Sequence, residues 1–226
     1  MKYILFDIYG TLIDSGGAGT RSLDLAFEEI FSIPDAFRSI SLAGKTDMQI
    51  LKEGLRLHRI ARMNGVVPEF FETYVKHLRN TIDGNRGQIK PGIKEALEVL
   101  RSYDGSVLGL LTGNIKEGAM IKLRAFGLDS YFRTGAFGDD SEDRNKLLPV
   151  AVDKLYERTS LRVDFRDCVV IGDTPRDIEC SKPYGAFAVA VATGPYAYGV
   201  LKDSGADAVF VDLSDTKRFI SALRCP

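Results

Sequence analysis

The chain of 226 residues lacks the features of several protein classes. It has 30 Lys and Arg against 31 Asp and Glu, so no basic surplus is present for binding nucleic acid or an anionic membrane surface. No apolar run approaches the roughly 20 residues that a membrane-spanning helix needs. Met1 and one Lys lead directly into an apolar run without a small-residue cleavage site, so we expect no signal peptide. We therefore expect a cytoplasmic protein without nucleic-acid or membrane partners.

Residues that commonly bind metal through nitrogen or sulfur are also scarce. The three cysteines, Cys168, Cys180 and Cys225, are odd in number and lack the spacing of a metal site. We expect them to be reduced thiols, as in most cytoplasmic proteins. The two histidines, His58 and His77, stand at no ligand spacing either. Any metal site in this chain should therefore use oxygen ligands.

Hydrophobic residues make up 45% of the chain and charged residues 27%, which is typical of a protein with a buried core. Short β-branched apolar runs alternate with segments of helical length. The predicted strands are 3–6, 107–112, 167–171, 186–191 and 208–211, and the predicted helices between them are 92–102, 116–126, 145–157, 175–184 and 216–223. This alternation predicts an α/β fold, a Rossmann-like parallel sheet with helices on both faces. Because crossovers are right-handed, the strand ends and any active site should lie along one edge.

The segment from about residue 15 to 87 interrupts the alternation. It contains helical patterns at 20–31, 47–63 and 69–83 and no convincing strand pattern. Glycine-rich joints at 16–19 and 83–87 flank these helices, as hinges of a lid would. We predict a core domain of residues 1–14 and 88–226 and an inserted α-helical cap domain of residues 15–87. The alternative is that the two joints are ordinary surface turns.

Four clusters of polar residues stand at or near the ends of predicted strands. They are Asp7-Ile8-Tyr9-Gly10-Thr11, Thr112-Gly113-Asn114, Lys146, and Asp173 with Asp177. An attacking Asp forms an aspartyl phosphate and divides one difficult displacement into two steps. Carboxylates hold Mg²⁺, while a hydroxyl, backbone amides and an ammonium stabilise the charged phosphoryl oxygens. Together the clusters predict phosphoryl transfer.

Two members of these clusters also have simpler interpretations. Lys146 lies in a generally charged segment, so it can be a surface residue at the start of a helix. Asp177 can serve the first turn of the helix that follows Asp173, where a carboxylate favours the helix dipole. A supporting position behind the metal ligands is compatible with that interpretation of Asp177.

With all four clusters in order, the chain resembles the haloacid dehalogenase (HAD) superfamily over essentially its full length. The helical insert is similar to the C1 cap of that superfamily. The resemblance implies the nucleophile at Asp7, the motif-two hydroxyl at Thr112, the motif-three lysine at Lys146 and the motif-four acids at Asp173 and Asp177. It also implies a Mg²⁺ cofactor, with the backbone carbonyl of Tyr9 as a further metal ligand.

Within the superfamily, residues 10–19 are similar to the phosphoglycolate phosphatase and phosphoglucomutase branch. Residues 43–47, Ala-Gly-Lys-Thr-Asp, are similar to the cap loop that reaches the substrate pocket in that branch. This implies that Lys45 meets a substrate anion. The alternative is that Thr46 or Asp47 caps the following helix and Lys45 is a solvated surface charge.

Tyr9 departs from the phosphatase pattern, which usually has a second Asp at this position. That Asp protonates the leaving alcohol and then activates the attacking water. A tyrosine with a pKa of about 10 is a poor base near neutrality, and general acid–base help is typically worth roughly 10²–10⁴-fold. The substitution therefore predicts slow turnover, whereas a backbone carbonyl at the same position can still bind the metal.

The sequence Asp-x-Tyr-Gly-Thr also resembles the metal-free 2-haloacid dehalogenases of the superfamily. Their second and fourth motifs generally read Ser-Asn and Ser-Ser-Asn-x-x-Asp, whereas this chain has Thr-Gly-Asn and retains Asp173. We therefore expect a Mg²⁺-dependent phosphatase that acts on a small phosphomonoester, such as phosphoglycolate, through an aspartyl phosphate on Asp7. The alternatives are a metal-independent 2-haloacid dehalogenase and a weakly catalytic protein that binds a phosphorylated ligand. The sequence predicts no oligomeric state.

Overall fold

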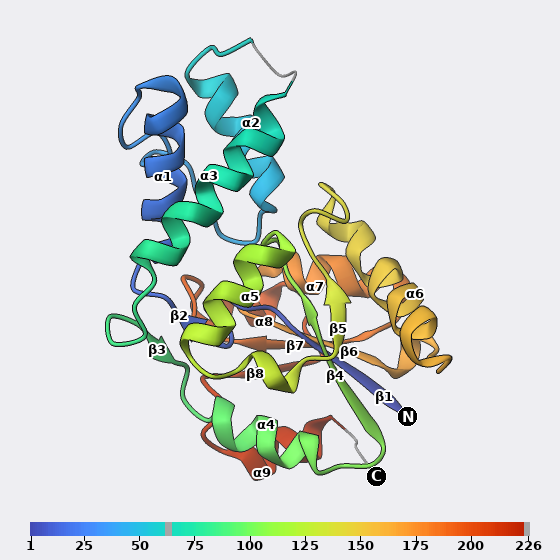
Figure 1. Ribbon diagram of the computed structural model, residues 1–226. Coiled ribbons are helices and arrows are strands. Elements are labelled where there is room, and N and C mark those ends of the chain that lie inside the picture. Colours follow the sequence, from blue (N-terminus) through green and yellow to red (C-terminus); the bar gives the residue numbers. More distant parts are fainter. Residues whose placement is uncertain (62–64, 224–226) are drawn as a thin grey trace.

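A six-stranded parallel sheet forms the centre of the molecule in the computed structural model, which describes residues 1–61 and 65–223 (Figure 1). The strand order is β5-β4-β1-β6-β7-β8. The strands are β1 (Lys2–Phe6), β4 (Ser106–Leu111), β5 (Thr134–Ala136), β6 (Cys168–Gly172), β7 (Phe187–Val191) and β8 (Ala208–Phe210). All five predicted strands of the sheet are present, and the predicted α/β class is confirmed. The short edge strand β5 was not predicted.

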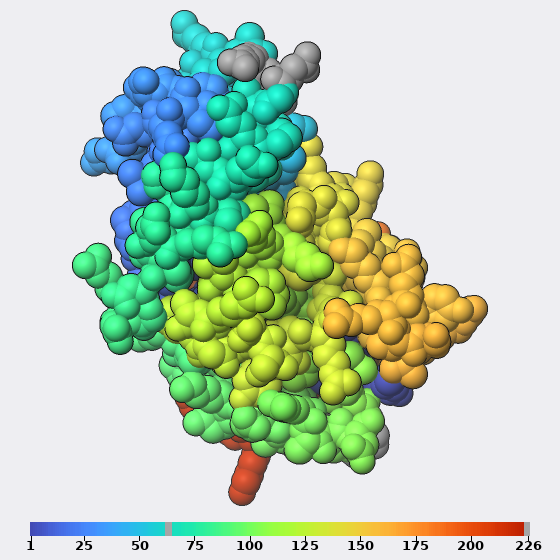
Figure 2. All heavy atoms as spheres, viewed as in Figure 1, coloured from blue at the N-terminus to red at the C-terminus, as the bar shows by residue number. Residues whose placement is uncertain are grey.

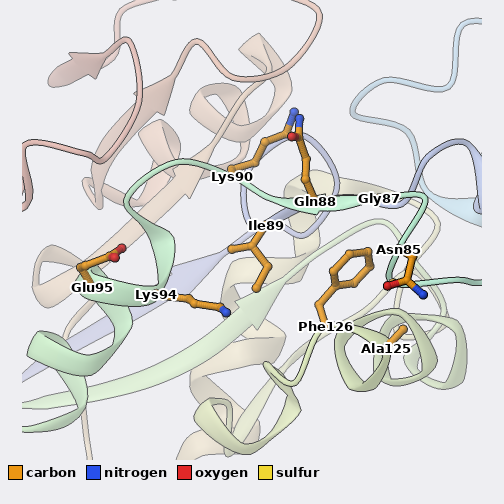
Figure 3. Close-up of a pocket in the computed structure, with 10 residues that line it drawn as sticks. Asn85, Gly87, Gln88, Ile89, Lys90, Lys94, Glu95, Ala125 and Phe126 are labelled. Atoms are coloured by element: carbon orange, nitrogen blue, oxygen red, sulfur yellow. The ribbon is translucent and has the colours of Figure 1, made fainter.

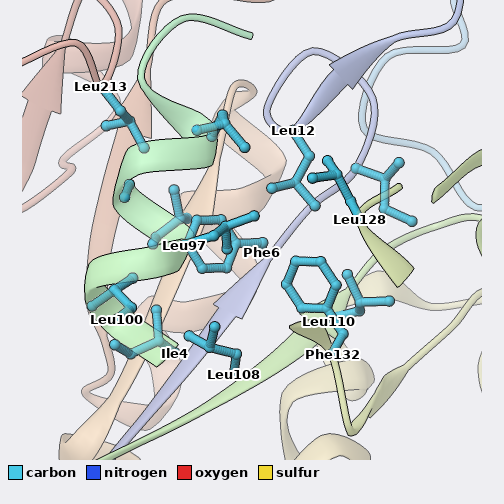
Figure 4. Close-up of a cluster of buried hydrophobic side chains, with 14 of the residues drawn as sticks. Ile4, Phe6, Leu12, Leu97, Leu100, Leu108, Leu110, Leu128, Phe132 and Leu213 are labelled. Carbon is cyan, nitrogen blue, oxygen red and sulfur yellow. The ribbon is translucent and has the colours of Figure 1, made fainter. Parts of the chain in front are cut away.

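Alternate residues of the central strand point to opposite faces of the sheet, as the two-residue period of a strand requires. Ile4 and Phe6 belong to the hydrophobic cluster shown in Figure 4, where Phe6 packs edge-on against Phe132 with ring centroids 6.0 Å apart. Tyr3 and Leu5 belong to the cluster on the other face. The first face is covered by α4 (Ile93–Arg101), α5 (Lys116–Ala125) and α9 (Thr216–Ala222), the second by α6 (Leu147–Thr159) and α7 (Pro175–Ser181).

Three helices of the predicted insert pack on one another at one end of the molecule. They are α1 (Ala18–Phe31), α2 (Asp47–Leu57) and α3 (Val66–Thr81), and in Figures 1 and 2 they form the blue and cyan lobe at the top. Phe27, Phe37 and Phe70 form the aromatic centre of this helical cluster. Ile115 and Ile121 join the same cluster, so the lobe rests on the segment that contains α5. The predicted end of the second helix, Met63, lies outside the described residues.

The two chain segments that enter and leave the helical lobe run side by side. Strand β2 (Ile13–Asp14) pairs antiparallel with β3 (Gln88–Ile89). Glycine is required here, because a Cβ at Gly16 would overlap the Arg86 carbonyl and one at Gly87 would overlap the Asp14 carbonyl. The two short strands lie directly next to the glycine-rich joints 16–19 and 83–87 of the sequence. The division into a 15–87 cap domain and a core domain stays a prediction.

Helix α8 (Tyr198–Asp203) packs on strands β7 and β8 and was not predicted. Within 1–61 and 65–223, no helix combines the length and apolar character needed to traverse a bilayer. Cys168 and Cys180 are buried free thiols, and Cys225 lies outside the described residues.

Candidate active site

Asp7, Thr112 and Asp173 come together at the carboxyl edge of the parallel sheet. Strand β1 pairs with β4 and β6 in registers that set Phe6 beside both Leu110 and Ile171. The residues that directly follow these three strand ends must therefore converge, as ligand-binding residues do in open α/β sheets. All three side chains are buried.

A third carboxylate, Asp177, completes a compact acidic cluster. One oxygen from each of Asp7, Asp173 and Asp177 lies within 4.8 Å of the others. Oδ2 of Asp177 accepts hydrogen bonds from the backbone N–H (2.9 Å) and the hydroxyl (2.8 Å) of Thr174, which caps α7. Its Oδ1 accepts from Arg144. Both oxygens of Asp177 thus accept hydrogen bonds from protein groups, which tie it to Arg144 and to the start of α7.

Arg144 is the cation that reaches this cluster, and Lys146 is not. The Arg144 guanidinium is buried, ion-paired with Asp177, and 3.2 Å from Oδ1 of Asp7 through Nη2. Lys146, the predicted motif-three lysine, is exposed as the N-cap residue of α6, and it forms no ion pair among the described residues. The reason is local: Asp143 caps the 3₁₀ turn Arg144–Lys146, whose first side chain points inward while its last remains in solvent.

Burial dominates the electrostatics of the acidic cluster. It raises the pKa of Asp7 to about 6, although Arg144 opposes this by favouring the carboxylate. Burial also raises the pKa of Asp173 well above its usual range, and the neighbouring Asp177 and Asp7 add to the effect. Arg144 is paired with Asp7 and Asp177, whereas Asp173 has no ion pair within residues 1–61 and 65–223, so this point of the structure is favourable for a cation.

Two glycines allow Asp173 to sit under the first loop. Gly10 has φ +83°, and a Cβ at Gly10 or Gly194 would overlap the Asp173 carboxylate. Oδ1 of Asp173 accepts a hydrogen bond from the Thr11 hydroxyl at 2.9 Å, while Oδ2 has no donor within residues 1–61 and 65–223. Asp173 thus presents one oxygen that the protein leaves available.

Tyr9 lies at the mouth of the site and is 45% exposed. Partial burial raises its pKa, and the nearby carboxylates of Asp14 and Asp173 raise it further. Its phenol is therefore an even poorer base near neutrality than a free tyrosine. This environment agrees with the expectation that Tyr9 does not replace the missing second Asp.

A cavity of about 140 Å³ opens above Asp7, between the helical lobe and the sheet. Gly113 and Asn114 line it, as predicted for phosphate-binding residues, and so does Lys45. Lys45 forms an ion pair with Glu53, and Thr46 caps α2 with a capping box. The capping interpretation of Thr46 is therefore right, whereas Lys45 is a partly buried, paired cation at the cavity rather than a solvated charge.

Among the other lining residues, Tyr74 and Lys122 were missed in the sequence, whereas Asp47 belongs to the 43–47 segment expected at the substrate pocket. Lys122 donates a hydrogen bond to Oδ1 of Asn114 at 2.6 Å and is only 4% exposed. Asp47 accepts from the Ile115 backbone N–H at 2.8 Å, which fastens α2 to the segment after β4. The available signal was weak, because a lysine or tyrosine at helical spacing is indistinguishable from a surface or core residue until the helices are docked.

A larger hollow of about 590 Å³ lies elsewhere, beside the second glycine-rich joint (Figure 3). Gln88 and Lys90 point to one side of the chain there, while Ile89 points to the other, toward the hollow that Phe126 also lines. Glu95 is the one acidic group among its lining residues. The hollow therefore lacks the converging acids of the Asp7 cavity, and we assign no chemistry to it.

Comparisons with known proteins agree with this geometry. The family model of haloacid dehalogenase-like hydrolases matches residues 1–183. The phosphoglycolate phosphatase of Aquifex aeolicus is 29% identical over 193 residues, covering 82% of this chain and 82% of the relative. That of Yersinia pestis is 25% identical over 220 residues, covering 95% and 91%.

Solved structures share the fold over nearly the whole chain. The β-phosphoglucomutase from Clostridium difficile superposes with a TM-score of 0.74 at 19% identity, covering 99% of this chain and 97% of that one. A hydrolase from Pseudomonas syringae gives a TM-score of 0.72 at 22% identity, covering 98% of each chain. The family match over most of the sequence, together with the acidic cluster at the sheet edge, means that the chain belongs to the haloacid dehalogenase-like hydrolases.

Proposed function

We propose that this protein is a Mg²⁺-dependent phosphatase that uses Asp7 as the nucleophile on small phosphomonoesters, with phosphoglycolate as the first candidate. One observation carries the proposal: the buried Asp7 carboxylate lies close to both Arg144 and Asp173 on the wall of the cavity. A nucleophile, a cation for the phosphoryl oxygens and a free carboxylate oxygen are the parts that phosphoryl transfer needs. The phosphoglycolate phosphatases among its relatives support this substrate class.

The residues present fit a magnesium ion. Asp7 and the free Oδ2 of Asp173 are hard oxygen donors of the kind Mg²⁺ prefers, and the Tyr9 backbone carbonyl is the proposed third ligand. Asp177 supports them from behind, since Arg144 and Thr174 take its oxygens. A bound Mg²⁺ would offset the repulsion between the Asp7 carboxylate and an anionic phosphate.

The first chemical step needs an ionised Asp7 in line with the ester. An Asp7 oxygen bonds to phosphorus while the bond between phosphorus and the ester oxygen breaks. The Thr112 hydroxyl and Arg144 are proposed to hold the phosphoryl oxygens. Nε of Arg144 is buried and has no acceptor in the described part of the chain, so one donor of this guanidinium is unsatisfied beside Asp7.

Proton transfers complete the cycle without a dedicated acid or base. The departing alkoxide takes its proton from water, since Tyr9 is a poor proton donor with a raised pKa. A second water attacks phosphorus as the bond between phosphorus and the Asp7 oxygen breaks, which releases inorganic phosphate and returns Asp7, and the proton that this water loses neutralises the hydroxide left by the first step. The sum is one ester and one water giving one alcohol and one phosphate. Both steps are slow in this account, because general acid–base help of roughly 10²–10⁴-fold is missing.

The cavity favours a small ester. Pockets for drug-sized ligands usually hold about 300–1,000 Å³. The Asp7 cavity has about 140 Å³ and is bounded by α1, α2 and α3 residues such as Leu23, Ile50 and Tyr74. An ester with a short carbon chain fits such a space, whereas a nucleotide does not.

Phosphate release tests the proposal. Inorganic phosphate is measured across small phosphate esters with Mg²⁺ and with EDTA, for the unaltered chain and Asp7→Asn. We expect release that requires Mg²⁺ and is lost in Asp7→Asn. Tyr9 is the observation that favours a second candidate, a metal-independent 2-haloacid dehalogenase, so chloride release from a 2-chloro acid is measured in parallel. Chloride release in EDTA without phosphatase activity would overturn the proposal.

A further inference from the structure

Lys122 and Tyr74 form a buried polar pair on the wall of the Asp7 cavity. Lys122 comes from α5, next to the sheet, and Tyr74 from α3 of the helical lobe, which lies directly above α5 in Figure 1. The Lys122 ammonium is 6.0 Å from the centre of the Tyr74 ring. The pair therefore contributes to the cavity wall from both the lobe and the segment next to the sheet.

Both side chains have hydrogen-bonding capacity that the protein does not use. Tyr74 is fully buried, and its hydroxyl has no partner in the described ranges 1–61 and 65–223. Lys122 carries three N–H donors, of which one goes to Asn114 Oδ1 in the same part of the chain. Buried polar groups are normally satisfied, because an unmade hydrogen bond costs about 1–3 kcal/mol. An oxygen acceptor inside the cavity would remove this cost.

The positive charge of Lys122 is also incompletely balanced. Burial lowers its pKa, and the Asp47 carboxylate, followed by that of Asp7, opposes the effect. No carboxylate of the described residues lies within ion-pair distance of Lys122. One oxygen of Asp47 accepts a hydrogen bond from the Ile115 backbone N–H instead. Lysines are almost never fully buried unless paired. An anionic ligand group is the partner that the site lacks.

Close packing fixes the position of both groups. A Cβ at Gly19 of α1 would stand 3.3 Å from the Lys122 ammonium, and one at Gly118 of α5 would stand 3.1 Å from Cε1 of Tyr74. These helices therefore approach the pair as closely as glycine allows. Larger side chains at Gly19 or Gly118 would press against the pair.

We propose that Lys122 and Tyr74 are specificity-determining residues that bind a carboxylate on the end of the ester that is not transferred. This inference rests on the proposed function and deepens it. The Lys122 ammonium and the Tyr74 hydroxyl donate to the two carboxylate oxygens, while Arg144 and Thr112 hold the phosphoryl group at Asp7. Esters of phosphate with a small hydroxy acid therefore bind better than esters of the same size without a carboxylate.

Ligand binding to the Asp7→Asn protein tests the inference separately from turnover. Calorimetric titration with Mg²⁺ compares phosphoglycolate, which has the carboxylate, with ethyl phosphate, which lacks it. We expect phosphoglycolate to bind about tenfold tighter or more, the value of a charge-assisted hydrogen bond. Adding Lys122→Met should abolish most of this preference, and adding Tyr74→Phe should reduce it by about two- to tenfold. Affinity for ethyl phosphate should change little.

Matched variants keep the test decisive. Tyr74→Phe removes a hydroxyl that bonds to no described residue, so it keeps the fold even if Lys122→Met is unstable in thermal unfolding. Tyr3→Phe makes the same change at a buried tyrosine of β1 outside the cavity, and Lys182→Met removes an exposed lysine paired with Asp207. Neither control should alter the preference.

Equal binding of the two esters, no binding of phosphoglycolate, or equal loss for both esters in Tyr74→Phe would overturn the inference. A carboxylate preference in a protein that releases no phosphate would instead overturn the proposed function and leave the inference standing.

Discussion

Nη2 of Arg144 lies 3.2 Å from Oδ1 of Asp7, and the same guanidinium is paired with Asp177. This buried arginine therefore joins the proposed nucleophile to Asp177, the first-turn residue of α7 that accepts hydrogen bonds from the Thr174 cap. It orients Asp7 and, in the proposed mechanism, also meets the phosphoryl oxygens. The exposed Lys146, two residues along the chain, can do neither.

Replacing Arg144 should be far more damaging than replacing Lys146. For Arg144→Gln we expect kcat for phosphate release to fall by about 10²–10³-fold, as when one donor to a transition-state oxyanion is removed. Lys146→Gln should stay within about twofold, because its side chain is exposed. Steady-state kinetics on folded protein, checked by thermal unfolding, measures both. Equal losses in the two variants would contradict the assignment of Arg144.

The stability of the metal-free protein should depend on Asp7 and pH. The pKa of Asp7 rises from 3.8 to about 6 on folding, which corresponds to about 3 kcal/mol at 1.36 kcal/mol per pKa unit. A raised folded pKa gives stability that is fully present below pH 3.8 and is lost as pH rises through about 6. Asp7→Asn should not lose stability in this way, because its amide does not ionise.

Urea unfolding in EDTA measures the effect. The unfolding free energy of Asp7→Asn is compared with that of the unaltered chain at about pH 4.5 and at about pH 7.5. The difference between the two proteins should be larger at pH 7.5 by about 2 kcal/mol, because part of the destabilisation by Asp7 already occurs below pH 4.5. If the difference in unfolding free energy is the same at both pH values, burial of the ionised Asp7 does not destabilise the folded protein.

Tyr9 variants separate a slow phosphatase from a dehalogenase. Tyr9→Asp should restore a general acid and base and raise kcat for phosphate release by about 10²-fold, the lower end of the usual range. Tyr9→Phe, the matched control, should leave kcat unchanged because the phenol takes no part in proton transfer. If Tyr9→Asp gains nothing, the proton-transfer explanation of slow turnover is wrong.

Asp177→Asn should destabilise the fold. The amide would lose the ion pair with Arg144 and one acceptor for the Thr174 cap, which together are worth about 2–4 kcal/mol. Chemical denaturation at neutral pH measures the change. Asp153→Asn, at an exposed position on α6, should change the unfolding free energy by less than about 0.5 kcal/mol. If Asp177→Asn lowers the unfolding free energy no more than this control does, Asp177 does not stabilise the site.

The parts of the fold that have strong periodic patterns can be predicted from the sequence. The apolar runs of β1, β4 and β6, each followed by a polar residue, are sufficient to bring Asp7, Thr112 and Asp173 together. Strand β5 (Thr134–Ala136) could not be predicted, because its three small residues at the edge of the sheet form no apolar run. The β2–β3 pair could not be predicted, because its two-residue strands form only where two segments far apart in the sequence lie side by side.

The cations of the site could not be identified in the same way. Arg144 and Lys146 are two residues apart in one charged segment, and the geometry of a single 3₁₀ turn decides which of them is buried. Lys122 lies on α5 at a position that becomes interior only when the helical lobe docks on it. Both depend on tertiary contacts between segments far apart in the sequence.

The most direct test of the central claim is the phosphorylation of Asp7 itself. The protein is mixed rapidly with phosphoglycolate and Mg²⁺, quenched in acid, digested and measured by mass spectrometry. We predict one added phosphoryl group on Asp7 that accumulates because Tyr9 does not activate water, and none in EDTA or in Asp7→Asn. Phosphate release by an Asp7→Asn protein, or release from the unaltered chain without any Asp7 adduct, would contradict the account.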